Sequence, residues 1–236
     1  MSLSFAAQSL SNITVINVPG LDGSGPNHWQ SHWDFSLPDC QRVQMGDWSL
    51  PIRSKWIDRL DRDLHRTDNP VLIAAHSLGC LAVAWWAKER WSFFHQDRVL
   101  GALLVAPPDI ERADAPKRIS TFSPAPREAL PFRSLLVASR NDPFASFAAS
   151  ERMAEMWNSA LVDLGDAGHI NADSGFGAWP EGLRLLASLN LPALHRPEER
   201  LFPAVAADQS GGVSPGRTLG HHDESVLELG DQSSPG

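Results

Sequence analysis

One stretch, Val71 to Cys80, constrains the fold of this chain more than any other. Its first five residues are apolar, which is typical of a buried strand in a parallel sheet. The residues after it place apolar side chains at helical spacing: Leu81, Ala82, Ala84, Trp85 and Ala87. Ser77 therefore stands at the predicted junction between this strand and this helix.

A serine at such a junction is typical of a nucleophile elbow. This tight turn strains the backbone and exposes the hydroxyl beside the helix N-terminus, where backbone amides favour negative charge. Only small side chains fit two positions before and after the serine, and Ala75 and Gly79 meet this requirement, although glycine is more usual at the first. The alternative is that Ser77 only caps a buried helix, a common role for serine.

Apolar runs of strand type alternate with helical patterns along the chain. We expect strands at 13–18, 41–45, 71–75, 100–106, 134–138 and 160–164. Helices are expected near 29–33, 53–65, 78–90, 145–157 and 178–189. This alternation predicts an α/β fold with a mostly parallel sheet of about six strands and helices on both faces. Ligands of such folds bind at the carboxyl ends of the strands, where Ser77 is expected to lie.

The chain has 236 residues, of which 42% are hydrophobic, so it can bury one sizeable core. We expect one domain over residues 1–193. Residues 194–236 are rich in Pro, Gly, Ser and acidic side chains and are expected to form a disordered tail. His221 and His222 lie in this tail without further candidate ligands, so we predict no metal site there. About 27 residues separate the fourth and fifth predicted strands, which is too few for a separate lid domain.

Charge and composition exclude several classes of function. The formal net charge is -8 and no dense cluster of Lys and Arg occurs, which argues against a nucleic-acid partner. The first residues do not resemble a signal peptide, and the longest apolar run, Val99 to Pro108, is too short to cross a bilayer. Cys40 and Cys80 suggest neither a disulfide framework nor a zinc site. We therefore expect a cytoplasmic protein that needs no membrane, metal or cofactor.

The sequence also offers partners for the serine. A hydroxyl is a weak nucleophile, so it needs a base to take its proton and a carboxylate to orient that base. Asp142 follows the predicted strand that ends at Ala138, and His169 follows the one that ends at Leu164. Both are expected at the same sheet edge as Ser77, in the chain order Ser, Asp, His that α/β-hydrolases use. We therefore predict a catalytic triad.

Each of these candidates has a plainer interpretation. Asp142 precedes a proline and fits an ordinary turn, and a loop histidine such as His169 often makes only a structural hydrogen bond. Asp166 is the reserve acid, but it lies too close to His169 along the chain to be preferred. Three other histidines fit the role of base less well, because one lies inside the elbow and two in polar connecting segments: His76, His65 and His95.

The tetrahedral oxyanion of acyl transfer needs two N–H donors. One is expected to be the amide of Leu78, directly after the nucleophile, and the other should come from the loop after the first strand. In that loop, residues 18–25, we expect the amide of Leu21, with Gly20 and Asp22 as alternatives. The loop glycines do not follow the pattern G-x-G-x-x-G and no P-loop lysine follows them, which argues against nucleotide binding.

Four segments carry a resemblance to a known family: Val18–Trp29, Ala75–Gly79, Ser139–Phe144 and Gly168–Asn171, the last followed by Ser174–Pro180. Together they resemble the small serine hydrolases of the YdeN and retinoblastoma-binding-protein-nine family, from about residue 12 to 191. The resemblance implies an α/β-hydrolase fold, with Ser77 as nucleophile, Asp142 as orienting acid and His169 as base. It also implies that three residues shape the mouth of the site, with core packing as an equal alternative: His28, Trp29 and Trp179.

The predicted function is hydrolysis of small acyl substrates, carboxylic esters foremost, through an acyl-enzyme intermediate. An amidase or aminopeptidase would use the same triad. The first strand begins too early in the chain for a preceding antiparallel hairpin, and two short segments are expected to roof a shallow site: Asp47–Trp48 and Pro107–Asp109. A non-catalytic protein-interaction module remains the alternative of a different class, because fold does not fix function and one member of the resembled family is named for a protein partner.

Overall fold

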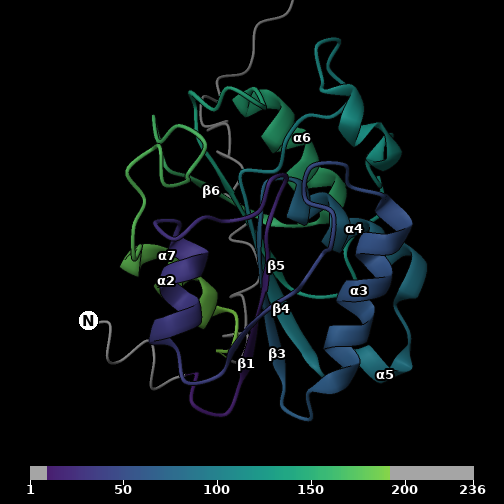
Figure 1. Cartoon of the computed structure of the whole chain (residues 1–236), viewed down its shortest axis with the longest axis vertical. Coiled ribbons are helices and arrows are strands. Elements are labelled where there is room, and N and C mark those ends of the chain that lie inside the picture. The colour runs from purple at the N-terminus through teal and green to yellow at the C-terminus, as the bar shows by residue number, and fades with distance from the viewer. Residues whose placement is uncertain (1–9, 192–236) are drawn as a thin grey trace, which may run out of the picture. The chain divides into compact units, whose positions relative to one another are not determined.

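A computed structural model describes residues 10–191 of the chain. The predicted tail, residues 194–236, lies outside the described residues, and so do His221 and His222. Six strands form one sheet in the order β2-β1-β3-β4-β5-β6, and every neighbouring pair is parallel (Figure 1). The strands are β1 (Thr14–Val18), β2 (Cys40–Arg42), β3 (Val71–His76), β4 (Val99–Val105), β5 (Ser134–Ala138) and β6 (Ala160–Asp163). The predicted α/β class and number of strands are confirmed.

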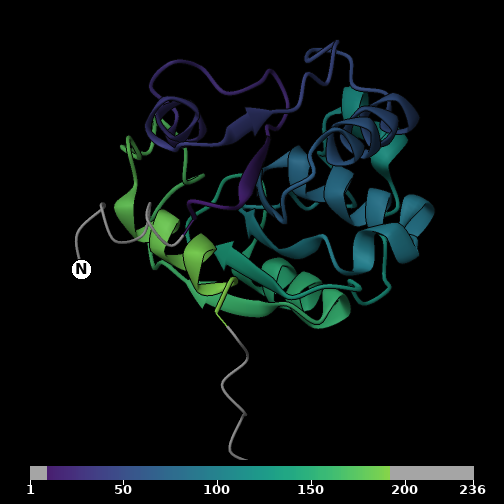
Figure 2. The same cartoon turned by 90° about the horizontal axis from the view of Figure 1, so that it is seen from below.

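Helices cover both faces of this sheet (Figures 1 and 2). One face carries α2 (Trp29–Ser36) and α7 (Pro180–Ser188), and the other carries α3 (Arg53–Arg66), α4 (Leu78–Arg90) and α6 (Phe147–Trp157). The sequence pattern does not predict the short α5 (Phe93–Gln96) or the 3₁₀-helix η1 (Lys117–Phe122). Elements this short do not span enough turns to show a hydrophobic period.

Tryptophan supplies much of the core. Five tryptophans are among the largest fully buried side chains: Trp29, Trp33, Trp56, Trp86 and Trp157. Two of them belong to α2 and pack on its side of the sheet, and three pack on the opposite face, so both layers depend on large aromatic rings. Helix α4 is buried on all sides from Leu78 to Ala87, which explains its many small residues and its position against the middle of the sheet.

The strand register brings the carboxyl ends of the central strands together. Val18 at the end of β1 pairs with Ala75, and His76 at the end of β3 pairs with Val105 at the end of β4. Among residues 10–191, no strand precedes β1, and the connection from β4 to β5 contains η1 but no separate lid domain. The loops that follow β1, β3, β4, β5 and β6 therefore open at one edge of the sheet.

Candidate active site

Ser77 occupies the strained turn between β3 and α4. Its backbone angles are φ 53° and ψ −127°, a region that non-glycine residues rarely adopt. The serine side chain makes no capping hydrogen bond to α4, which disfavours the helix-cap alternative. Instead its hydroxyl oxygen lies 3.0 Å from Nε2 of His169. The backbone geometry is that of a nucleophile elbow.

Close backbone contacts explain the small residues around this turn. A Cβ atom at Gly79 would lie 2.3 Å from the carbonyl oxygen of Val18, so any side chain there would push α4 away from β1. At Gly20 a Cβ atom would lie 2.7 Å from Cβ of Ser77. The loop after β1 therefore lies directly against the elbow, and glycine at these two positions permits it.

The structure brings Ser77, His169 and Asp142 together. Nδ1 of His169 lies 2.9 Å from Oδ2 and 3.1 Å from Oδ1 of Asp142, while Nε2 faces the serine. The side chains of His169 and Asp142 are 9% and 3% exposed, so this hydrogen-bonded pair is largely shielded from water. Asp142 also accepts a hydrogen bond from the amide of Phe144 at 2.8 Å, so the turn interpretation holds as well. The reserve acid, Asp166, is exposed.

Hydrogen bonds between two loops hold the acid and the base in register. The amide of Gly168 donates to Oδ1 of Asn141 at 2.7 Å, which ties the loop after β6 to the loop after β5. Ser139 strengthens this link, since its hydroxyl accepts from the amide of Ala167 at 2.9 Å and donates to Asn141 at 2.8 Å. Side chains of the loop after β5 therefore hold the backbone that precedes His169 beside Asp142.

Two backbone amides beside the serine are free to bind an oxyanion. In the described part of the chain, neither the amide of Leu78, at the first position of α4, nor that of Leu21 donates a hydrogen bond. The amide of Asp22 is already used, because it donates to the carbonyl of Trp48 at 3.0 Å. Of the expected alternatives for the second donor, Asp22 is therefore unsuitable, while Gly20 and Leu21 remain.

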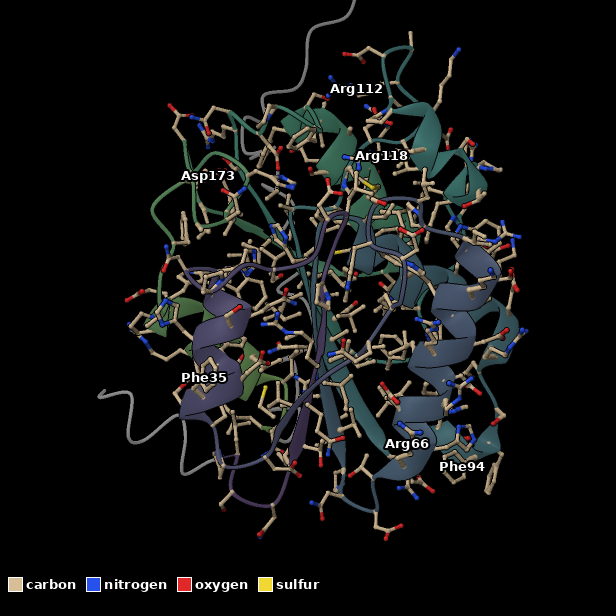
Figure 3. The ribbon with its side chains drawn as sticks, in the orientation of Figure 1. Phe35, Arg66, Phe94, Arg112, Arg118 and Asp173 are labelled. Carbon is tan, nitrogen blue, oxygen red and sulfur yellow. The ribbon has the colours of Figure 1, made fainter. Side chains whose placement is uncertain are left out.

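A cavity of about 420 Å³ opens over Ser77. Its lining includes Pro108 and Asp109, as expected, but Asp47 and Trp48 are not among the described residues that line it. Much of the remaining wall comes from Arg112, Asp114 and η1, which the sequence interpretation missed. Figure 3 shows Arg112, Arg118 and Asp173, all of them lining residues, toward the same end of the molecule.

The three residues implied at the mouth by family resemblance separate into two groups. His28 lines the cavity, although it is only 5% exposed. Trp29 and Trp179 are 0% and 6% exposed, contact each other with ring centroids 5.3 Å apart, and belong to the core beneath α2. For these two tryptophans the mouth assignment is wrong and the core-packing alternative holds, since neither is among the described lining residues.

Two further imidazoles lie behind the base. Nε2 of His76 lies 2.9 Å from the carbonyl oxygen of His169 and must donate to it, because a carbonyl can only accept. His28 packs against His76 with ring centroids 4.6 Å apart, and its Nδ1 accepts from the amide of Gln30 at the start of α2. Burial lowers the pKa of His28 to about 3 and that of His76 well below its usual range. Both rings are therefore neutral near pH 7.

A second group of imidazole and carboxylate side chains lies elsewhere, on α3 and α5. Asp61, His65 and His95 have ligand atoms within 4.8 Å of one another. However, Nδ1 of His95 accepts a hydrogen bond from the amide of Ser92 at 3.2 Å, so the ring proton sits on Nε2, which faces Asp61. A metal ligand needs a lone pair on the nitrogen that faces the ion. The donor set therefore does not suit a metal.

None of the helices between residues 10 and 191 is long and apolar enough to cross a membrane.

Comparison with known proteins identifies the family of the chain. The family model described as serine hydrolase matches residues 15–188. YdeN of Bacillus subtilis (strain 168), which is named as a hydrolase, is 24% identical over 177 residues, covering 70% of this chain and 90% of YdeN.

Two solved structures are similar to the chain in sequence and fold. A YdeN-like hydrolase of Pectobacterium atrosepticum SCRI1043 is 33% identical with a TM-score of 0.69, covering 80% of this chain and 97% of that one. The B. subtilis ydeN product has a TM-score of 0.59 at 21% identity, covering 75% of this chain and 97% of that one, and shows the same fold. The chain belongs to the serine hydrolase family.

Proposed function

We propose that the protein hydrolyses small carboxylic esters through an acyl-enzyme intermediate. The observation that carries this proposal is the continuous chain of hydrogen-bond distances from Asp142 through His169 to Ser77, at 2.9 and 3.0 Å. A base must lie within about 2.6–3.2 Å of the atom whose proton it takes, and His169 meets this condition.

In the proposed mechanism, Ser77 attacks the acyl carbonyl while Nε2 of His169 takes the hydroxyl proton. Asp142 holds the imidazole through Nδ1–H and stabilises the imidazolium that forms. The amides of Leu78 and Leu21 receive the oxyanion, and His169 then gives its proton to the leaving alcohol. Water then attacks the acyl-enzyme while His169 takes a proton from it. His169 returns this proton to the oxygen of Ser77 as the carboxylic acid leaves.

The cavity favours small substrates without negative charge. Its 420 Å³ volume is at the small end of ligand pockets, which span about 300–1,000 Å³. Among residues 10–191, the lining includes four aspartates, Asp22, Asp109, Asp114 and Asp173, but only two arginines, Arg112 and Arg118. Both arginines already pair with an aspartate of this set. A neutral or cationic acyl compound is therefore preferred over an anionic one.

Ser77→Ala tests the proposal most directly. We expect turnover of an activated ester such as p-nitrophenyl acetate to fall by about 10⁴-fold, because the hydroxyl forms the covalent bond. Wild-type protein should be labelled by a fluorophosphonate probe, and Ser77→Ala should not. A loss smaller than tenfold would refute the nucleophile, and folded wild-type protein that takes no label would favour a non-catalytic interaction module.

Short peptide amides assayed beside acyl esters of graded chain length separate the esterase from an amidase or aminopeptidase. The three activities use the same triad and differ in which leaving group the cavity accepts. Faster turnover of amides than of matched esters would replace the ester proposal while keeping Ser77, His169 and Asp142 in their roles.

A further inference from the structure

Arg118 joins three segments at the mouth of the cavity. Its guanidinium donates to both carboxylate oxygens of Asp22, at 2.8 Å from Nη1 and 2.7 Å from Nη2. Nη1 also donates to the carbonyl oxygen of Ser49 at 3.3 Å. Arg118 lies in η1, Asp22 in the loop after β1 and Ser49 in the loop after β2. One side chain therefore links parts of the chain that are far apart in sequence.

Asp22 directly follows Leu21, whose amide is the proposed second oxyanion donor. The amide of Gly23 donates to the carbonyl of Gly20 at 3.1 Å, so residues 20–23 form a closed turn. Asp22 has φ 60° in this turn, and its own amide is fixed on Trp48. The Leu21 N–H shares a peptide plane with the Gly20 carbonyl, which the Gly23 amide holds, so the position of Asp22 between Leu21 and Gly23 constrains the direction of the donor.

The base of the same turn rests on aromatic packing. A Cβ atom at Gly23 would be 3.6 Å from the ring of Trp48, so this ring lies against the turn backbone. The Trp48 ring packs edge-on against Trp56 at 5.8 Å, and Trp56 against Phe122 of η1 at 5.5 Å. This packing holds the fold together beneath the turn, while the Arg118–Asp22 ion pair contacts only its exposed tip.

The ion pair adds little to folding. The side chains of Arg118 and Asp22 are 38% and 56% exposed, and ion pairs at such positions contribute little stability because water and salt screen them. Its bidentate geometry instead fixes direction, since two parallel hydrogen bonds allow only one relative orientation of the groups. An oxyanion donor is effective when it is oriented before the reaction, so this turn requires a fixed direction for the Leu21 N–H.

We propose that Arg118 is a positioning residue that, by holding Asp22, keeps the Leu21 amide directed at the oxyanion. This inference rests on the proposed hydrolase function. Arg118 itself need not touch the substrate. Its effect is expected in the rate of the chemical step rather than in substrate binding.

Three variants test this role: Arg118→Gln, Asp22→Asn and the double variant. Asparagine tolerates a positive φ, so Asp22→Asn removes the charge without straining the turn. We expect each single variant to lower kcat on p-nitrophenyl acetate about tenfold, a part of what a lost oxyanion donor costs, with KM changed less than about twofold. The double variant should be no slower than either single one, because all three lose the same interaction.

Arg127→Gln is the matched control. Arg127 lies in the same connection between β4 and β5 and pairs with Glu111 at 3.1 Å, but it does not line the cavity over Ser77. Its kcat should stay within about twofold of wild type, and thermal unfolding of every variant should show that the fold is kept. High salt should lower kcat of the wild type but not of Arg118→Gln, because it screens only the intact pair.

Several results would overturn the proposal: full kcat in Arg118→Gln, an equal loss in Arg127→Gln, or a change confined to KM, which would make Arg118 a substrate-binding residue instead. A wild-type protein that neither hydrolyses the ester nor takes the fluorophosphonate probe would overturn the proposed function and this inference together. An active, labelled wild type with an equally active Arg118→Gln would overturn this inference alone.

Discussion

Two regions of this protein place histidine and aspartate side chains close together, and they differ in nearly every other respect. At the carboxyl edge of the sheet, His169 lies 2.9 Å from Asp142 and 3.0 Å from the Ser77 hydroxyl. Between α3 and α5, Nε2 of His95 lies 3.5 Å from Asp61 and makes no hydrogen bond to any residue that the structure describes. Figure 3 places Arg118, beside the first group, and Phe94, whose ring stacks on His65, toward opposite ends of the molecule.

The environment explains the difference in chemistry. His169 lines a cavity, and its second nitrogen lies 3.0 Å from the hydroxyl oxygen of Ser77, so a proton can move between these two groups. His95 is 2% exposed, packs against Trp86 and Trp91, and caps α5 through its first nitrogen. The same residue types thus suit the proposed reaction in one region and serve packing in the other, and geometry distinguishes them.

The largest expected effect is on kcat, and it is tested by replacing the aspartate of each region with asparagine. Asp142→Asn should lower kcat on an activated ester by about 10⁴-fold, because an amide no longer selects the productive tautomer of His169. Asp61→Asn should leave kcat within about twofold, since Trp86 keeps its oxygen acceptor and no reacting atom is near. Equal losses in the two variants would show that the regions are not functionally distinct.

Stability should respond in the opposite order. His95→Ala should lower the free energy of unfolding by about 2 kcal/mol, because it empties a buried site and removes the α5 cap. Ser77→Ala should change it by less than about 1 kcal/mol, since His169, the one side-chain partner of Ser77 among the described residues, faces a cavity that water can enter. Chemical denaturation measures both values, and a larger loss for Ser77→Ala would contradict this ordering.

A smaller effect should appear in the pH dependence of stability. Burial lowers the pKa of His28 from 6.5 to about 3, so below pH 6.5 the unfolded chain binds a proton that the folded chain does not. The free energy of unfolding should therefore fall as the pH drops from 6.5 toward 3. His28→Asn keeps a side chain that can cap α2 but has no titrating group, and should unfold with about one proton less taken up near pH 5. Parallel pH curves for the two proteins would exclude this role for His28.

The smallest expected effect is that of zinc on the Asp61–His65–His95 group. We expect one equivalent of Zn²⁺ to shift the unfolding temperature by less than about 1 °C, because the proton on Nε2 of His95 occupies the ligand position. A clear rise in that temperature, abolished by His65→Ala, would show instead that this region is a metal site.

Local sequence signals were sufficient for the elements that surround the elbow. Ser77 could be placed because an apolar strand and a periodic helix meet there, and Asp142 and His169 because each follows a recognisable strand. The prediction for the edge strand is less accurate, because it covers residues 41–45 whereas β2 spans Cys40–Arg42. Val43 and Met45 are buried as their apolar character suggests, and the amide of Val43 still donates to the carbonyl of Asn17 at 3.0 Å. However, β1 ends at Val18, so it does not extend far enough to pair with Met45.

The walls of the cavity could not be predicted in the same way. Arg118 reaches the site from η1, and its partner Asp22 lies 96 positions away, so no local pattern connects them. For Trp29 and Trp179 the prediction fails in the other direction: both were expected at the mouth of the site but belong to the core. Long-range contacts decide which side chains face a cavity, and a single sequence carries little direct record of them.

The connection between β4 and β5 lines much of the cavity yet carries none of the three residues proposed as nucleophile, base and acid. It therefore offers a place where mutation can alter which compounds enter while the reacting groups stay on the ends of other strands. An engineer who wished to retarget this scaffold would vary that connection first and leave the rest of the sheet edge intact.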